Sequence, residues 1–317
     1  MPDSNTIIFG GSGFIGQHLA SILGSRGNCF DINSAGVSKF CDVRNPIEIK
    51  CDNVEVIYNL AAIHITPGHE YFEYFETNIK GAKNICNFAR EKNINTIVFT
   101  SSIAPYGTWE DEKFEDSLPL PTSAYGSSKL VAEEIHKRWQ AEKPNERKLI
   151  IVRPGVVFGQ NEGGNFTRLY RAIKKRKFFY PGRKDTKKAA IYVKDLVRIM
   201  VEMTEKETHG IHLYNTVYTP THSIQEICIT MAKVTGAKAP SITIPSGLLK
   251  IAATSINSVG KMIGKTFDGI HHDRVKKLMI STNINGQKLL DHGYKIEYTI
   301  EDAIKDWYNE CDREKLH

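Results

Sequence analysis

The chain has 317 residues, of which 41% are hydrophobic and 25% are charged, a balance that is typical of a folded globular protein and excludes a disordered one. Its net charge of +6 is small and dispersed, which argues against a nucleic-acid-binding protein. The six cysteines form no C-x-x-C pair and no cysteine–histidine metal spacing, so we expect reduced thiols, no bound metal and a cytoplasmic location.

No segment predicts a secreted or membrane-spanning protein. The first residues lack the basic and apolar regions of a signal peptide, and no window reaches the ~18 uninterrupted apolar residues of a spanning helix. Residues 248–263 are moderately apolar but contain Lys250, Asn257 and Gly260, so we interpret them as a surface or lid helix. We therefore expect no membrane partner.

Short apolar runs alternate with helical patterns through the first half of the chain. Buried strands are predicted at residues 6–9, 54–59, 96–99 and 148–152, and helices at residues 17–23, 70–90 and 124–140. Such alternation predicts parallel strands joined by right-handed crossovers, and hence an α/β doubly wound sheet.

The pattern loosens after residue 155. Glycine and basic residues are frequent at 159–188, a helix is predicted at 191–203 and a strand at 210–215, and short helices and turns follow from residue 220. We interpret the basic cluster at 174–177 as a solvated helix end, with a phosphate-binding stripe as the alternative. The predicted domains are a sheet domain of residues 1–155 plus 189–218, and a smaller mixed α/β C-terminal substrate-binding cap of residues 156–188 plus 219–317.

A glycine-rich turn follows the first predicted strand. Gly10, Gly13 and Gly16 form G-x-x-G-x-x-G between a strand and a helix, which favours a tight turn, close backbone approach to a diphosphate, and helix–strand packing. The diphosphate would lie on the helix N-terminus, where free N–H groups favour negative charge. The turn predicts a Rossmann-type dinucleotide site.

Asp31 is the acid expected at the end of the second strand, where it would bind ribose hydroxyls and disfavour a 2′-phosphate. This favours NAD as the cofactor. If the strand continued to Ser34, the preference would lose its support, so NADP stays open.

A second motif places a phenol and an ammonium on one helix face. Tyr125 and Lys129 form Y-x-x-x-K, and residues i and i+4 share a face of a helix. A nearby lysine and a positive nicotinamide ring would lower the pKa of the phenol, so that Tyr125 would exchange a proton with a hydroxyl or ketone during hydride transfer.

Together these motifs resemble the extended short-chain dehydrogenases/reductases, and specifically the NAD-dependent epimerase/dehydratase family that modifies nucleotide sugars. The resemblance rests on the glycine turn with Phe14 and Ile15 before its last glycine, on the segment of Ser102 that ends at Gly107, and on Y-x-x-x-K. It implies Ser102 as a catalytic residue that also binds substrate. The other cofactor-binding positions that it implies, besides Tyr125 and Lys129, are Asp42, Val43, Leu60, Ala61, Ala62, Asn78 and Pro154; Asn78 could instead only bridge structure.

The residues after Ser102 narrow the predicted reaction. Family dehydratases carry Asp-Glu there, whereas Ile103 and Ala104 cannot transfer protons. The remaining hypotheses are a 4-epimerase and a 4-keto reductase of a nucleotide-diphosphate sugar. Val156 and Lys188 differ from the residues of a standard galactose epimerase. For the substrate diphosphate we consider Asn165, Lys188 and Arg274, with guanidinium best suited to phosphate.

Two other classes stay open, a steroid- or flavonoid-type alcohol reductase and a non-catalytic cofactor-sensing protein. The resemblance also implies a homodimer formed through the helices at residues 70–90 and 125–140.

Overall fold

The computed structural model describes residues 5–34, 36, 38–64, 68–245, 247, 279–311 and 316. Its main feature is a seven-stranded sheet in the order β10-β6-β5-β4-β1-β2-β3, in which every adjacent pair is parallel. The strands are β1 (Asn5–Phe9), β2 (Gly27–Asp31), β3 (Lys39–Phe40), β4 (Val54–Asn59), β5 (Thr96–Thr100), β6 (Lys148–Pro154) and β10 (Gly210–Thr216). The predicted doubly wound parallel sheet is confirmed.

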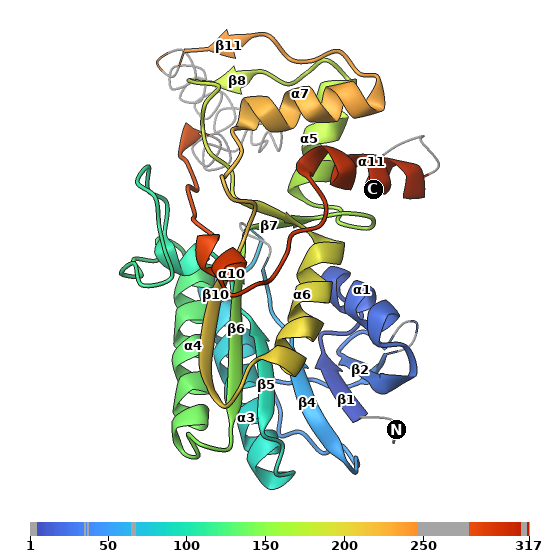
Figure 1. Ribbon diagram of the computed structural model, residues 1–317, viewed down its shortest axis with the longest axis vertical. Coiled ribbons are helices and arrows are strands. Elements are labelled where there is room, and N and C mark those ends of the chain that lie inside the picture. The colour runs from blue at the N-terminus through green and yellow to red at the C-terminus, as the bar shows by residue number, and fades with distance from the viewer. Residues whose placement is uncertain are drawn as a thin grey trace, which may run out of the picture.

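Helices cover both faces of this sheet (Figure 1). One face packs against α1 (Phe14–Leu23) and α6 (Val193–Lys206), and the other against α3 (Gly81–Glu91) and α4 (Ala124–Ala141). Alternation along the strands supplies both layers, because Ile8 and Val98 belong to the first while Ile7 and Ile97 belong to the second.

Two predicted helices differ in the structure. Residues 70–90, predicted as one helix, form α2 (Tyr71–Tyr74), the π-helix η2 (Phe75–Lys80) and α3. The predicted helix at 191–203 begins only at Val193, because the two preceding residues belong to strand β9 (Ala190–Tyr192). Short apolar runs fit a strand or a buried helix equally well, which explains the second error.

The chain leaves the sheet directly after β6. Strand β7 (Val156–Phe158) pairs with β9, and Figure 1 shows α5 (Asn165–Lys174), α7 (Ile224–Thr235) and α11 (Ile300–Glu310) grouped beyond one end of the sheet. The short strands β8 (Tyr180–Pro181) and β11 (Thr243–Ile244) pair beside them. Short α10 (Gln287–Asp291) packs against β10, and Lys288 Nζ donates to the Leu213 carbonyl, 2.9 Å away.

The predicted lid helix at 248–263 lies outside the described residues. In the part of the chain that is described, every helix is too short or too polar to cross a bilayer.

Candidate active site

The glycine turn lies between β1 and α1 and leaves no space for a side chain at Gly10 or Gly16. Gly10 has φ +87°, and its N–H donates to the Phe30 carbonyl at 2.8 Å. A Cβ on Gly10 would lie 2.8 Å from the Ala61 nitrogen, and one on Gly16 would lie 2.2 Å from the Gly10 oxygen. Gly13 is the N-cap of α1, and its lack of a capping side chain leaves the first amides of α1 available to an anion.

Asp31 is the last residue of β2, as the sequence predicts, and its carboxylate lies beside this turn. Its Oδ2 accepts the Ser12 N–H at 3.1 Å, and its Oδ1 accepts the Asn33 N–H at 3.1 Å. Two backbone hydrogen bonds therefore fix the carboxylate next to the glycine turn. This arrangement fits the ribose of a dinucleotide, and with the uncapped start of α1 it makes the edge a suitable NAD site.

The other predicted cofactor positions line the same edge of the sheet. Leu60, Ala61 and Ala62 follow β4, and the Leu60 N–H donates to the Phe9 carbonyl at 2.9 Å. Asp42 pairs with Arg44 at 2.8 Å, which lowers the pKa of its carboxyl. The neighbouring Val43 is buried.

Asn78 lies in the π-helix η2, and protein groups occupy both of its amide atoms. Its Oδ1 accepts the Ile63 N–H at 3.0 Å, and its Nδ2 donates to the Ser128 hydroxyl at 2.8 Å. Asn78 thus links the segment after β4 to α4. These bonds fit the bridging alternative.

Ser102 and Tyr125 lie together beyond the end of β5, and Lys129 follows Tyr125 by one turn of α4. Ser102 follows that strand by two residues, and Tyr125 and Lys129 occupy consecutive turns of α4, which begins at the Ser123 cap. The Ala104 N–H donates to the Ser102 hydroxyl at 3.1 Å, and Ser102 lies close enough to the Tyr125 phenol to lower its pKa. Lys129 is buried, with its Nζ 4.4 Å from the centre of the Phe99 ring.

Burial sets the pKa of both titratable groups. It raises the pKa of the Tyr125 phenol to about 12, against a lowering contribution from Ser102. It lowers the pKa of the Lys129 ammonium to about 7, against a raising contribution from Glu133. The protein's own side chains therefore keep the phenol protonated at neutral pH, and the lowering predicted from the sequence depends on the charge of the nicotinamide ring.

A buried ion pair behind these residues was missed in the sequence. Glu133, one turn after Lys129 on α4, accepts from Arg153 of β6 at 2.6 Å and 2.9 Å. Glu133 and Arg153 are 0% and 2% exposed. Glu133 also accepts the Ser101 hydroxyl at 2.5 Å, and the guanidinium stacks 4.6 Å from the centre of the Tyr106 ring. The i, i+4, i+8 spacing from Tyr125 is the signal that could have identified Glu133.

The predicted substrate residues have partners of their own in this structure. Asn165 begins α5, and its Oδ1 accepts from Arg168 at 2.9 Å. Lys188 Nζ donates to the Ile280 carbonyl at 2.7 Å, and burial lowers its pKa to about 8. Arg274 lies outside the described residues. Pro154, a predicted cofactor position, ends β6, and its carbonyl accepts the Ile103 N–H at 3.2 Å.

The chain is similar in sequence to two curated relatives. An N-acetyl-α-D-glucosaminyl-diphospho-ditrans,octacis-undecaprenol 4-epimerase of Escherichia coli O157:H7 is 26% identical over 310 residues, which cover 95% of this chain and 93% of the relative. A GDP-6-deoxy-D-talose 4-dehydrogenase of Aggregatibacter actinomycetemcomitans is 27% identical over 219 residues, which cover 65% and 73% of the two chains.

The chain is also similar to a solved structure and matches a family model. MoeE5 in complex with UDP-glucuronic acid and NAD is 20% identical and has a TM-score of 0.74, with 97% of this chain and 100% of MoeE5 covered, which shows a shared fold. The sequence model of the NAD dependent epimerase/dehydratase family matches residues 6–216. The chain therefore belongs to the NAD-dependent epimerase/dehydratase family and is an enzyme with NAD as its cofactor.

Proposed function

We propose that this enzyme is a 4-epimerase of a sugar carried on a diphosphate, with Tyr125 as its acid and base. The observation that supports the proposal is that Ser102 lies beside Tyr125, with Lys129 one helical turn further along α4, at the sheet edge that holds the glycine turn. The Escherichia coli relative, named a 4-epimerase, supports it because the similarity extends over nearly the whole of both chains, cap included.

The proposed chemistry divides between the cofactor and the side chains. The glycine turn and Asp31 would hold NAD, which would supply a reversible hydride acceptor for sugar C4. The Ser102 hydroxyl orients the C4 oxygen, and the Tyr125 phenolate takes its proton and later gives it back. The Lys129 ammonium stabilises that phenolate. The Ala104 amide hydrogen bond to Ser102 holds the serine in place for this role.

The side chains that follow Ser102 argue against dehydration. Ile103 and Ala104 occupy the start of the short helix η3 (Ala104–Tyr106), where a dehydratase needs groups that move protons between neighbouring carbons. Neither side chain can do so.

A 4-keto reductase is the second candidate. The Aggregatibacter relative, named a 4-dehydrogenase, supports it over about two thirds of this chain. We favour the epimerase because the similarity to the Escherichia coli 4-epimerase also covers the cap. An epimerase must let the keto-sugar turn over between the two hydride transfers.

The carrier of the sugar can be a nucleotide, as the sequence predicts, or a polyprenol, as in the name of the Escherichia coli relative. Both carriers present a diphosphate. We propose Lys188, with Arg274, as its ligand, because the partly buried Lys188 ammonium and a guanidinium are cations suited to a doubly charged group.

The test incubates NAD-loaded enzyme with UDP-N-acetylglucosamine, UDP-glucose and undecaprenyl-diphospho-N-acetylglucosamine, and follows both the 4-epimer and NADH absorbance. We expect the 4-epimer from one carrier without net change in NADH. Tyr125→Phe should lower kcat by about 10²–10⁴-fold, and Tyr298→Phe, in the segment before α11, serves as the matched control. Stoichiometric consumption of NADH would identify the reductase, and full activity of Tyr125→Phe would refute the mechanism.

A further inference from the structure

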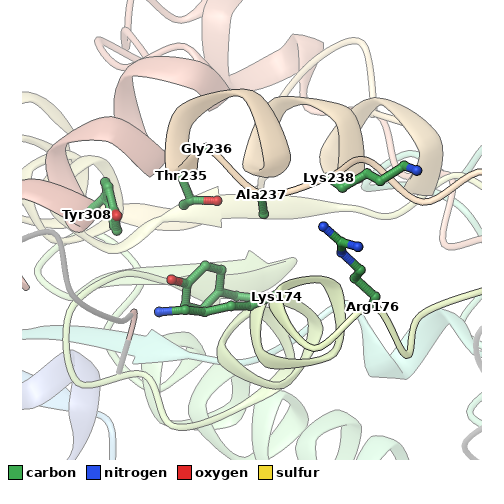
Figure 2. Close-up of a pocket in the computed structure, with 8 residues that line it drawn as sticks. Lys174, Arg176, Thr235, Gly236, Ala237, Lys238 and Tyr308 are labelled. Atoms are coloured by element: carbon green, nitrogen blue, oxygen red, sulfur yellow. The ribbon is translucent and has the colours of Figure 1, made fainter.

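A pocket of about 250 Å³ lies on the cap, between α5, α7 and α11. Lys174 and Arg176 reach it from the end of α5, and Lys238 from the segment after α7 (Figure 2). The hydroxyl-bearing residues Tyr170, Thr235 and Tyr308 also line it. None of these residues belongs to the cluster of Ser102, Tyr125 and Lys129.

The charges of this pocket have one sign. Its described lining holds three cationic side chains and no aspartate or glutamate. Figure 2 shows the Arg176 guanidinium directed across the pocket toward Ala237 and Lys238. Lys174 extends along the Tyr170 ring, with its Nζ 5.6 Å from the ring centre. Like charges held around one hollow repel one another, and an anion between them relieves that repulsion.

The backbone at Arg176 provides a second, independent observation. The Arg176 N–H donates to the Ile173 carbonyl and the Lys177 N–H to the Ala172 carbonyl, so α5 ends in a Schellman motif with Arg176 in its left-handed position at φ +55°. The matching positions after α3 and α10 hold Asn93 and Gly293, the usual residues there.

The helix dipole accounts for basic residues near the end of α5, but it does not account for an arginine at the left-handed position. Glycine or asparagine would satisfy the same two hydrogen bonds with less strain. In the left-handed conformation the Cβ of an arginine lies too close to the following carbonyl oxygen. From this strained position the Arg176 guanidinium points into the pocket. The conformational strain of the backbone at Arg176 therefore indicates a function of its side chain.

We infer that this pocket binds a phosphate group, with Arg176 as its principal donor and Lys174 and Lys238 as supporting cations. A planar guanidinium presents paired N–H donors that match phosphate oxygens, and the Tyr308 hydroxyl supplies a further donor. This is the alternative that the sequence leaves open for the basic cluster at 174–177. The inference goes beyond the proposed function and does not depend on it.

The phosphate could belong to a soluble phosphorylated molecule or to a lipid headgroup, and two experiments distinguish these sources. Inorganic phosphate is titrated calorimetrically into enzyme saturated with NAD, at constant ionic strength, so that the glycine turn is already filled. We expect saturable binding, and a Kd about tenfold higher in Arg176→Ala and in Lys238→Ala. Lys175→Ala removes a neighbouring exposed charge that does not line the pocket, and should leave the Kd unchanged.

The second experiment sediments the same variants with vesicles of phosphatidylcholine, alone or mixed with phosphatidylglycerol. If the native enzyme binds the mixed vesicles and Arg176→Ala and Lys238→Ala abolish that binding, the pocket is assigned to lipid headgroups. Phosphate binding without vesicle binding would assign it to a soluble ligand.

Arg176→Gly separates a binding role from a structural one. We expect it to weaken phosphate binding as Arg176→Ala does, and to keep the Tm or raise it by about 2 °C because glycine relieves the strained backbone. Two results would overturn the inference. One is phosphate and vesicle binding that no pocket substitution changes, and the other is a lower Tm in Arg176→Gly with phosphate binding retained.

Discussion

At the residue scale, we propose that the position of Asp31 favours NAD over NADP. Its two oxygens accept from the Ser12 and Asn33 backbone amides, so the carboxylate is fixed beside the glycine turn before any ligand arrives. A fixed negative charge there accepts ribose hydroxyls and repels a 2′-phosphate.

Replacing Asp31 should change cofactor selectivity. We expect Asp31→Ala to raise the Kd of NAD about tenfold or more, and to lower that of NADP, since a charged hydrogen-bond acceptor is lost. Fluorescence titration with both cofactors measures the ratio. Asp52→Ala, at the other end of the sheet before β4, is the comparison. An unchanged NAD to NADP ratio in Asp31→Ala would contradict this account.

At the scale of elements, the pair of Glu133 and Arg153 joins α4 to β6 behind the catalytic residues. Both groups are buried and hydrogen bonded, so removing one charge leaves the other uncompensated. We expect Glu133→Gln to lower the free energy of unfolding by about 3–5 kcal/mol, and the double variant Glu133→Leu/Arg153→Met to recover most of that loss. Urea denaturation measures both. A loss below about 1 kcal/mol in Glu133→Gln would show that the pair does not hold α4 in place.

His136, also on α4, makes the stability of the sheet layer depend on pH. Its Nδ1 lies 2.7 Å from the Ala132 carbonyl and its Nε2 3.2 Å from the Asn59 amide, an arrangement of a neutral ring. Burial lowers its pKa from 6.5 to about 4, so between these values the unfolded chain binds more protons and stability falls as pH falls.

The consequence can be measured by comparing the enzyme with His136→Gln at pH 7 and pH 5. Because His136 is fully buried, we expect the native protein to lose about 2 kcal/mol more than the variant over this interval. Equal losses in the two proteins would mean that His136 titrates normally in the folded state.

Some of these elements could be predicted from the sequence and others could not. The strands and the glycine turn follow from local patterns, since an apolar run before G-x-x-G-x-x-G leaves few alternatives. The π-helix η2 does not, because Asn78 reaches Ile63 and Ser128 through tertiary contacts that no periodicity encodes. Arg153 lies twenty residues from Glu133 in another element, so their pairing required the folded chain.

At the scale of the whole molecule, exposed apolar side chains lie on the helices predicted to form a dimer. Tyr71 and Phe72 of α2 are 73% and 63% exposed, and Val131 of α4 is 42% exposed. These elements pack together through η2. We propose that these side chains lie in the interface of the predicted homodimer.

Sedimentation velocity tests this prediction. We expect a dimer for the native enzyme and a monomer for Phe72→Glu/Val131→Glu, because two buried charges oppose association. Ile242→Glu, at an exposed apolar position on the cap, is the control and should remain dimeric. A native monomer would refute the prediction.

The most direct test of the proposed epimerase mechanism uses substrate labelled with deuterium at sugar C4, on the carrier that turns over. Because the hydride taken from C4 should return to the same carbon, we predict a 4-epimer that retains deuterium at C4, with no net formation of NADH. Epimer formed with loss of the label to solvent, or accumulation of oxidised sugar with stoichiometric NADH, would contradict the mechanism.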